Sequence, residues 1–167
     1  MDIEIDKLTN SIENVITGDS FDTEVSLILK EDLKAIKKGI GWKFDWKYEF
    51  GQSDRKIFKL TIMDNKSVIQ GLISISDYKD HIYIHVIESS PFNRGKRKMY
   101  VGVPGNLMAF ACKDSWDKGY EGFVSFISKT RLIDHYEQTL GAIHVGGHKM
   151  VIFPKEALKL IKKYYKL

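Results

Sequence analysis

The residues best suited to chemistry lie in one loop and at the start of the segment that follows it. The loop carries four cations, namely Arg94, Lys96, Arg97 and Lys98. An apolar, β-branched run (81–87) ends before the loop, and a helix-like run (107–116) begins after Gly102-Val-Pro-Gly105. Free N–H groups at a helix N-terminus attract anions, glycine permits close approach to the backbone, and Arg and Lys bind phosphate oxygens. This order of elements predicts an anion site that suits a diphosphate.

The same run resembles the phosphate loop of the GNAT superfamily of acyl-CoA-dependent N-acyltransferases. The family pattern is Arg/Gln-x-x-Gly-x-Gly/Ala; here Met99 occupies the first position and Pro104 stands where the second Gly or Ala is usual. Two later segments also resemble the family, at its fifth strand and at the end of the following helix: Gly119-Tyr-Glu-Gly-Phe-Val-Ser-Phe and His135-Tyr-Glu-Gln-Thr-Leu-Gly-Ala142. The resemblance extends over about residues 56–153.

The resemblance implies one GNAT-like α/β domain over residues 1–167. Its central sheet would be mixed and mostly antiparallel, with one splayed pair of parallel strands and helices on both faces. The implied activity is transfer of an acetyl group from acetyl-CoA to an unknown amine, a small molecule or a protein, by direct attack in a ternary complex. The alternative is a non-catalytic module on the same fold that binds CoA, a nucleotide, RNA or a protein.

The resemblance also assigns residues to the donor. It places the diphosphate among the backbone amides of Val101, Gly102, Val103, Gly105 and Asn106, with Arg97 and Lys98 as candidate phosphate contacts. Pro104 has no N–H and removes one donor from this set. The alternative is an ordinary Gly-Pro turn beside a solvated basic loop.

Two further residues match catalytic positions of the family. Glu88 ends the strand beside the expected thioester and would act as the base for the acceptor amine, next to an apolar wall. Tyr136 matches the tyrosine whose hydroxyl protonates the leaving thiolate. The structural alternatives are a solvent-exposed or capping carboxylate for Glu88, and a core tyrosine at helical spacing between Leu132 and Leu140.

Hydrophobic periodicity and turn residues predict the elements that position these groups. Residues 1–22 fit either a short helix or a loop. The remaining predicted elements are strands at 23–29, 57–63, 68–75, 82–87 and 122–128, an aromatic strand at 42–50, helices at 30–38, 104–116 and 132–140, a hairpin at 142–153 around Gly146-Gly147, and a helix from Pro154. The strand at 122–128 follows its predecessor through a helix, so the two should run parallel.

Composition limits the remaining function classes. A length of 167 residues suits one domain with its own core. Twenty-six Lys and Arg against 22 Asp and Glu give a net charge of +4, which suits an anionic ligand and makes nucleic acid an unlikely partner. The single cysteine, Cys112, excludes an internal disulfide and a Cys-rich zinc site, and we expect no metal. No apolar run approaches about 18 residues. We expect a cytoplasmic protein without membrane contact, as a monomer or an oligomer.

Overall fold

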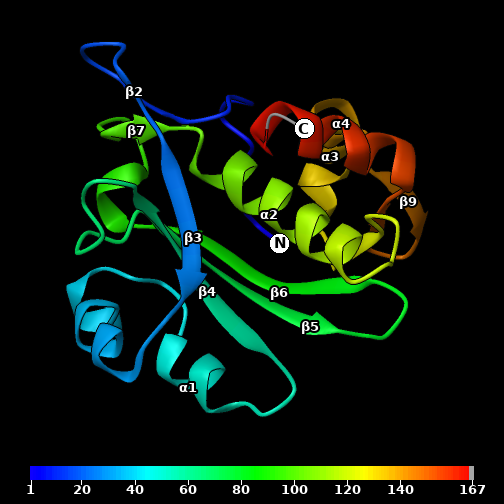
Figure 1. Ribbon diagram of the computed structural model, residues 1–167, viewed down its shortest axis with the longest axis horizontal. Helices are drawn as coiled ribbons and strands as arrows, with labels where there is room; N and C mark the ends of the chain where they lie inside the picture. The colour runs from blue at the N-terminus through cyan, green and yellow to red at the C-terminus, as the bar shows by residue number, and fades with distance from the viewer. Residues whose placement is uncertain (166–167) are drawn as a thin grey trace.

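A seven-stranded mixed sheet organises the protein in the computed structural model, which describes residues 1–165 (Figure 1). Its strands, in spatial order, are β3 (Thr23–Leu27), β4 (Lys56–Ile62), β5 (Gly71–Asp77), β6 (Ile82–Ser89), β8 (Val124–Ile127), β10 (Lys149–Ile152) and β9 (Ile143–Gly146). All neighbours pair antiparallel except β6 and β8, which are parallel. The predicted sheet, with its single parallel pair, is confirmed.

Helices cover both faces of this sheet. On one face α2 (Val103–Asp117) packs against β5, β6 and α4 (Pro154–Tyr165), and α3 (Ile133–Leu140) contributes Tyr136 and Leu140 to the same core. On the other face α1 (Trp46–Gly51) covers a smaller core below β4 (Figure 1). β5 is buried along nearly its whole length because both cores press against it.

The N-terminal region forms a small second sheet. β1 (Ile12–Asn14) pairs antiparallel with β2 (Ser20–Phe21) on one side and with β7 (Tyr100–Val101) on the other. The helix considered for residues 1–22 is therefore wrong, because pairing with β7 and complete burial of Ile12 hold this segment extended. The N-terminus itself lies near the centre of the molecule, between α2 and β6 in Figure 1.

Two predictions between β3 and β4 are also wrong. Residues 30–38 form two short 3₁₀ segments, Lys30–Ala35 and Lys38–Ile40, instead of an α-helix. The aromatic run at 42–50 contains α1 instead of a strand. Asp45 starts α1 by accepting a 3.0 Å hydrogen bond from the Tyr48 N–H. Trp42 lies before α1 and Trp46 is its first residue, and both are buried in the smaller core.

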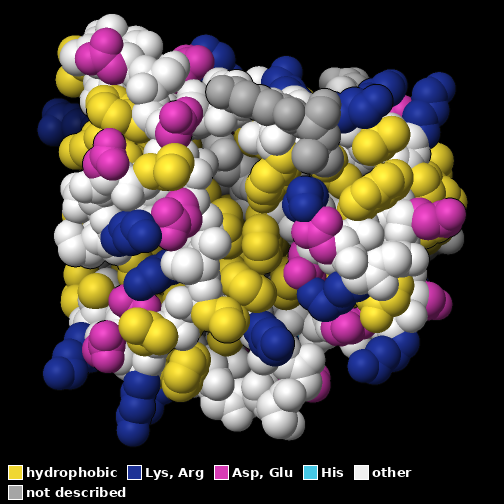
Figure 2. Space-filling model, viewed as in Figure 1, with side chains coloured by type: hydrophobic (Ala, Val, Ile, Leu, Met, Phe, Trp, Pro, Cys, Tyr) yellow, Lys and Arg dark blue, Asp and Glu magenta, His cyan; other side chains and the backbone are white. Residues whose placement is uncertain are grey.

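The face of the molecule that carries β3 and α2 is partly apolar. Figure 2 shows hydrophobic side chains exposed between these two elements, where Val25, Phe58 and Phe110 are only partly buried. A hollow of about 480 Å³ lies there, lined in part by Val25 and Phe110. Within residues 1–165, no helix combines the length and the apolar character that a membrane crossing needs.

Candidate active site

The candidate site begins where the parallel pair separates. β6 and β8 pair only from Ile82 to Ile84 on β6 and from Val124 to Phe126 on β8. His85 is an extra residue in β6, because Ser74 pairs with Val86 while Ile75 pairs with Ile84. A bulge bends its strand, and β6 then continues to Ser89 without β8 beside it. This local irregularity opens the splay that the resemblance implied.

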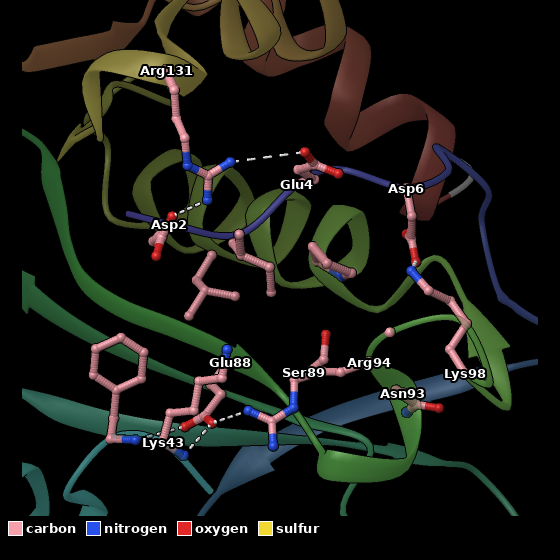
Figure 3. A pocket seen from close by; sticks show the side chains of 15 residues that line it. Asp2, Glu4, Asp6, Lys43, Glu88, Ser89, Asn93, Arg94, Lys98 and Arg131 are labelled. Carbon is pink, nitrogen blue, oxygen red and sulfur yellow. Dashed lines mark hydrogen bonds and ion pairs between the residues drawn. The ribbon is translucent and has the colours of Figure 1, made fainter.

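A cavity of about 290 Å³ lies against the open end of β6. Figure 3 shows that its charged side chains come from four separate parts of the chain, the N-terminal segment, the loop before α1, the end of β6 with its loop, and the 3₁₀ turn before α3. The acidic ones are Asp2, Glu4, Asp6 and Glu88, and the basic ones are Lys43, Arg94, Lys98 and Arg131. Equal numbers of the two signs leave the cavity without a dominant charge.

Residues 1–9, called here the N-terminal strap, cross this cleft. The Met1 nitrogen donates to the Ile127 carbonyl, and the Met1 carbonyl accepts from the Lys129 N–H at 3.0 Å, which is the pattern of a parallel pair. The Tyr136 hydroxyl donates to the Ile3 carbonyl. The Ile5 N–H donates to His135 Nε2 at 2.8 Å, and the Ile5 side chain is only 6% exposed. The strap thus pairs in parallel with the end of β8 and lies in the splay.

The strap then reaches the start of α2. The Asp6 carboxylate accepts from the Gly102 N–H at 3.0 Å and from Lys98 Nζ at 3.0 Å. Gly102 has φ +101, and a Cβ there would lie 2.8 Å from Thr9 Cγ2. A Cβ on Gly105 would lie 3.1 Å from the Lys7 carbonyl oxygen. The predicted phosphate loop is therefore covered by the chain's own N-terminal segment.

The other predicted phosphate contacts have varied surroundings. Val101 belongs to β7 and pairs with Glu13 of β1. The Asn106 side chain donates to the Ser11 carbonyl at 3.1 Å and accepts from Thr23, so it joins α2 to the N-terminal region. Val103 is buried and Arg97 is exposed. The structure brings all of these residues except Arg97 together around the start of α2, and their role toward phosphate stays a prediction.

Glu88 is surrounded by hydrogen-bond donors, so the expected apolar wall is wrong. The side chain is 3% exposed. Its carboxylate accepts from four groups, the Lys43 N–H (2.6 Å), the Phe44 N–H (3.2 Å), Trp46 Nε1 (2.8 Å) and Arg94 (3.0 Å). These four bonds use the accepting capacity of both carboxylate oxygens. In this arrangement Glu88 fixes the loop before α1 against the end of β6, and its role as a base stays a prediction.

Tyr136 lies on the buried stripe of α3, as its spacing predicts. Its ring is fully buried and packs edge-on against Phe126, with ring centroids 5.2 Å apart. Burial raises the pKa of its hydroxyl well above the ordinary value. The hydroxyl therefore stays protonated near neutral pH and can act as a hydrogen-bond donor, which here serves the Ile3 carbonyl.

Asp6 and His135 were missed as site residues. Both contacts join positions that are far apart in the sequence, since Asp6 and Gly102 are separated by 96 residues. One local signal was present: Asp2-Ile-Glu-Ile-Asp6 alternates polar and apolar residues, which is typical of a half-buried strand. Among residues 1–165, no group of three or more His, Cys, Asp or Glu side chains is placed to hold a metal ion.

A diphosphate does not fit the start of α2 in this conformation. Asp6 already takes the Gly102 N–H, and Lys7, Leu8 and the Tyr164 hydroxyl lie over Gly105. The position that the resemblance assigns to an anionic ligand thus holds an anionic side chain of the same chain.

The comparisons with known proteins concern solved structures, because no family model and no curated protein matches the chain. Spermidine N-acetyltransferase from Vibrio cholerae, in complex with CoA and spermine, aligns over 81% of this chain and 98% of its own, with 13% identity and a TM-score of 0.55. The ribosomal-protein-S18-alanine N-acetyltransferase from Escherichia coli aligns over 77% and 90%, with 15% identity and a TM-score of 0.55. A mutant AtaT toxin, bound to the antitoxin AtaR C-terminus and acetyl-CoA, aligns over 84% and 99%, with 10% identity and a TM-score of 0.55. At these identities the likeness concerns the fold, and this chain has the fold of the GNAT acetyltransferases.

Proposed function

We propose that this chain is an N-acyltransferase that moves an acyl group, acetyl in the simplest case, from acetyl-CoA to an amine. In such a reaction a C–N bond forms, the C–S bond of the thioester breaks, the amine loses a proton and the thiolate gains one. The observation that carries the proposal is the splay of β6 and β8. The splay starts at the His85 bulge. The start of α2 and the Tyr136 hydroxyl both contact the N-terminal strap that lies in it.

The comparisons support this reading at the level of the fold. One structural neighbour is an acetyltransferase in complex with CoA and spermine, and another is a toxin bound to acetyl-CoA. A protein with the same fold is a reasonable candidate for the same class of donor. The acceptor of this chain would be an amine on a small molecule or on a protein.

The proposed residue roles follow the chemistry of each group. Tyr136 is a buried, protonated hydroxyl and is suited to donate to a leaving thiolate. Lys98 and the Gly102 N–H are donors that suit phosphate oxygens as well as they suit Asp6. Glu88 is suited to positioning, because its carboxylate accepts four hydrogen bonds that join the loop before α1 to the end of β6.

Release of free thiol from acetyl-CoA, measured with a panel of amines, tests the proposal. The panel would include spermine and a peptide with an N-terminal alanine. The chain's own thiol does not disturb this assay, because Cys112 is buried and burial raises its pKa to about 12. Amine-dependent thiol release that falls in Tyr136→Phe would support the acyltransferase. Absence of release with every amine would contradict it for those acceptors.

A second function is supported by a specific observation. The strap fills the splay and covers the start of α2, as expected for a non-catalytic module that kept the fold but lost the donor site. This module would not be stabilised by acetyl-CoA. Thermal unfolding with and without acetyl-CoA separates it from the enzyme, since a ligand that binds only the folded state raises the melting temperature.

A further inference from the structure

We propose that the N-terminal strap is an internal competitor of the acyl donor, held by the same groups that would bind that donor. The proposal rests on the proposed function, because it assigns the donor to the splay and to the start of α2. It adds a regulatory state in which the chain closes its own site, and it predicts that donor binding and strap binding exclude each other.

The first argument is the chemical likeness between the strap and the donor. CoA carries an arm with amide groups that ends in a diphosphate. The strap offers peptide groups followed by the Asp6 carboxylate, which corresponds to the diphosphate in this comparison. The Tyr136 hydroxyl holds a strap carbonyl, while the Gly102 N–H and Lys98 hold the carboxylate. An amide carbonyl and an anion of the strap thus accept hydrogen bonds from the groups that would bind acetyl-CoA.

The second argument is the reach of the strap. Asp6, which meets α2, lies three positions after Ile3, which meets α3. An extended chain covers about 10 Å over three residues. Figure 3 shows this stretch passing between Arg131 on one side and the end of β6 on the other. The strap therefore connects both ends of the proposed donor site in one continuous segment.

The third argument is that the strap can leave without disturbing the rest of the fold. The side chains of its pair Arg131 and Glu4 are 61% and 69% exposed, and their charged atoms lie 4.0 Å apart, so water screens the attraction. Ile5 is the one residue of the strap that is buried, with 6% of it exposed. The chain beyond the strap is fixed differently, because Ile12 is buried completely and β1 pairs on both sides. Release can thus end before β1 without unfolding the small sheet.

The test measures CoA affinity by calorimetry for the full chain and three variants. Ile5→Ala weakens the buried anchor without changing charge, and Asp6→Asn weakens the contact with Gly102. Asp19→Asn is the matched control, because it makes the same chemical change as Asp6→Asn at an exposed position outside the strap and the cavity. We expect CoA to bind at least about tenfold more tightly to Ile5→Ala and Asp6→Asn, and with unchanged affinity to Asp19→Asn.

Hydrogen exchange of residues 3–9 supplies the second readout. We expect CoA to accelerate exchange at the Ile5 amide, because that amide loses His135 when the strap leaves. If CoA binds all four proteins equally and the strap stays protected, the competition is refuted while the acyltransferase stands. If CoA binds none of them, although exchange shows the strap released in Ile5→Ala, both the competition and the acyltransferase are refuted. The two failures are therefore distinguishable.

Discussion

Replacing Tyr136 by Phe tests the link between the strap and the site most directly. The change removes one oxygen and leaves the edge-on packing against Phe126 in place. The lost interaction is the hydrogen bond to the Ile3 carbonyl. A hydrogen bond of this kind contributes a net free energy of about 1 kcal/mol. Because 1.4 kcal/mol corresponds to a factor of ten, the fraction of molecules with a released strap should rise about 5-fold.

Two assays measure this effect. The Ile5 amide should exchange about 5-fold faster in Tyr136→Phe, since its exchange follows the released fraction. CoA affinity should change by less than this factor, because the hydroxyl is lost to the donor as well as to the strap, and turnover at saturating CoA should fall if the hydroxyl protonates the thiolate. The melting temperature should drop by about 2–4 °C for a chain of this size.

Tyr120→Phe is the matched control. Its hydroxyl donates to Asp77 at 2.8 Å on the surface, so the variant also loses one tyrosine hydrogen bond, but far from the strap. It should leave exchange at Ile5 and CoA affinity unchanged. Equal exchange in wild type and Tyr136→Phe would refute the reasoning about the strap, even if turnover fell.

Three further predictions concern other parts of the structure. Glu88→Gln should lower the free energy of unfolding by about 2–3 kcal/mol in denaturant titrations. The new NH₂ group would face hydrogen-bond donors, and Arg94 would lose its charged partner. An unchanged stability with altered turnover would instead support the base role. Gly102→Ala should cost at least about 2 kcal/mol, measured in the same way, through its φ of +101 and its Cβ contact of 2.8 Å with Thr9; Gly18→Ala, with φ +76 and open space, should cost less. The pKa of His85 is lowered by burial and by Arg55, so stability should fall as pH drops below about 6.5, where only the unfolded chain takes up the proton; His85→Gln should flatten that slope in pH-dependent unfolding.

The central part of the fold was readable because its signals are local. The apolar run of β6, the Gly-Pro entry into α2 and the strand after Gly122 follow one another within about fifty residues. A parallel pair with a helix between its strands is then required by connectivity. Tyr136 was placed correctly on the buried face of α3 by helical spacing alone.

The contacts within the candidate site could not be predicted because they join residues that are far apart in the sequence. Glu88 carries no mark in the sequence that it will meet the Lys43 and Phe44 amides, more than 40 residues away. The run at 42–50 was misassigned because alternating aromatics resemble a strand, whereas the Asp45 cap and the burial of Trp46 in the first turn favour a helix. Tertiary burial outweighed local pattern at these positions.

The burial of Cys112 has a practical consequence for spectroscopy. It is the only thiol of the chain and it lies within α2, away from reagents. A cysteine introduced at Glu4, whose side chain is 69% exposed, would therefore be the one site that a maleimide dye can reach quickly. A fluorophore placed there would report the position of the N-terminal segment in single molecules, without any need to remove the native cysteine first.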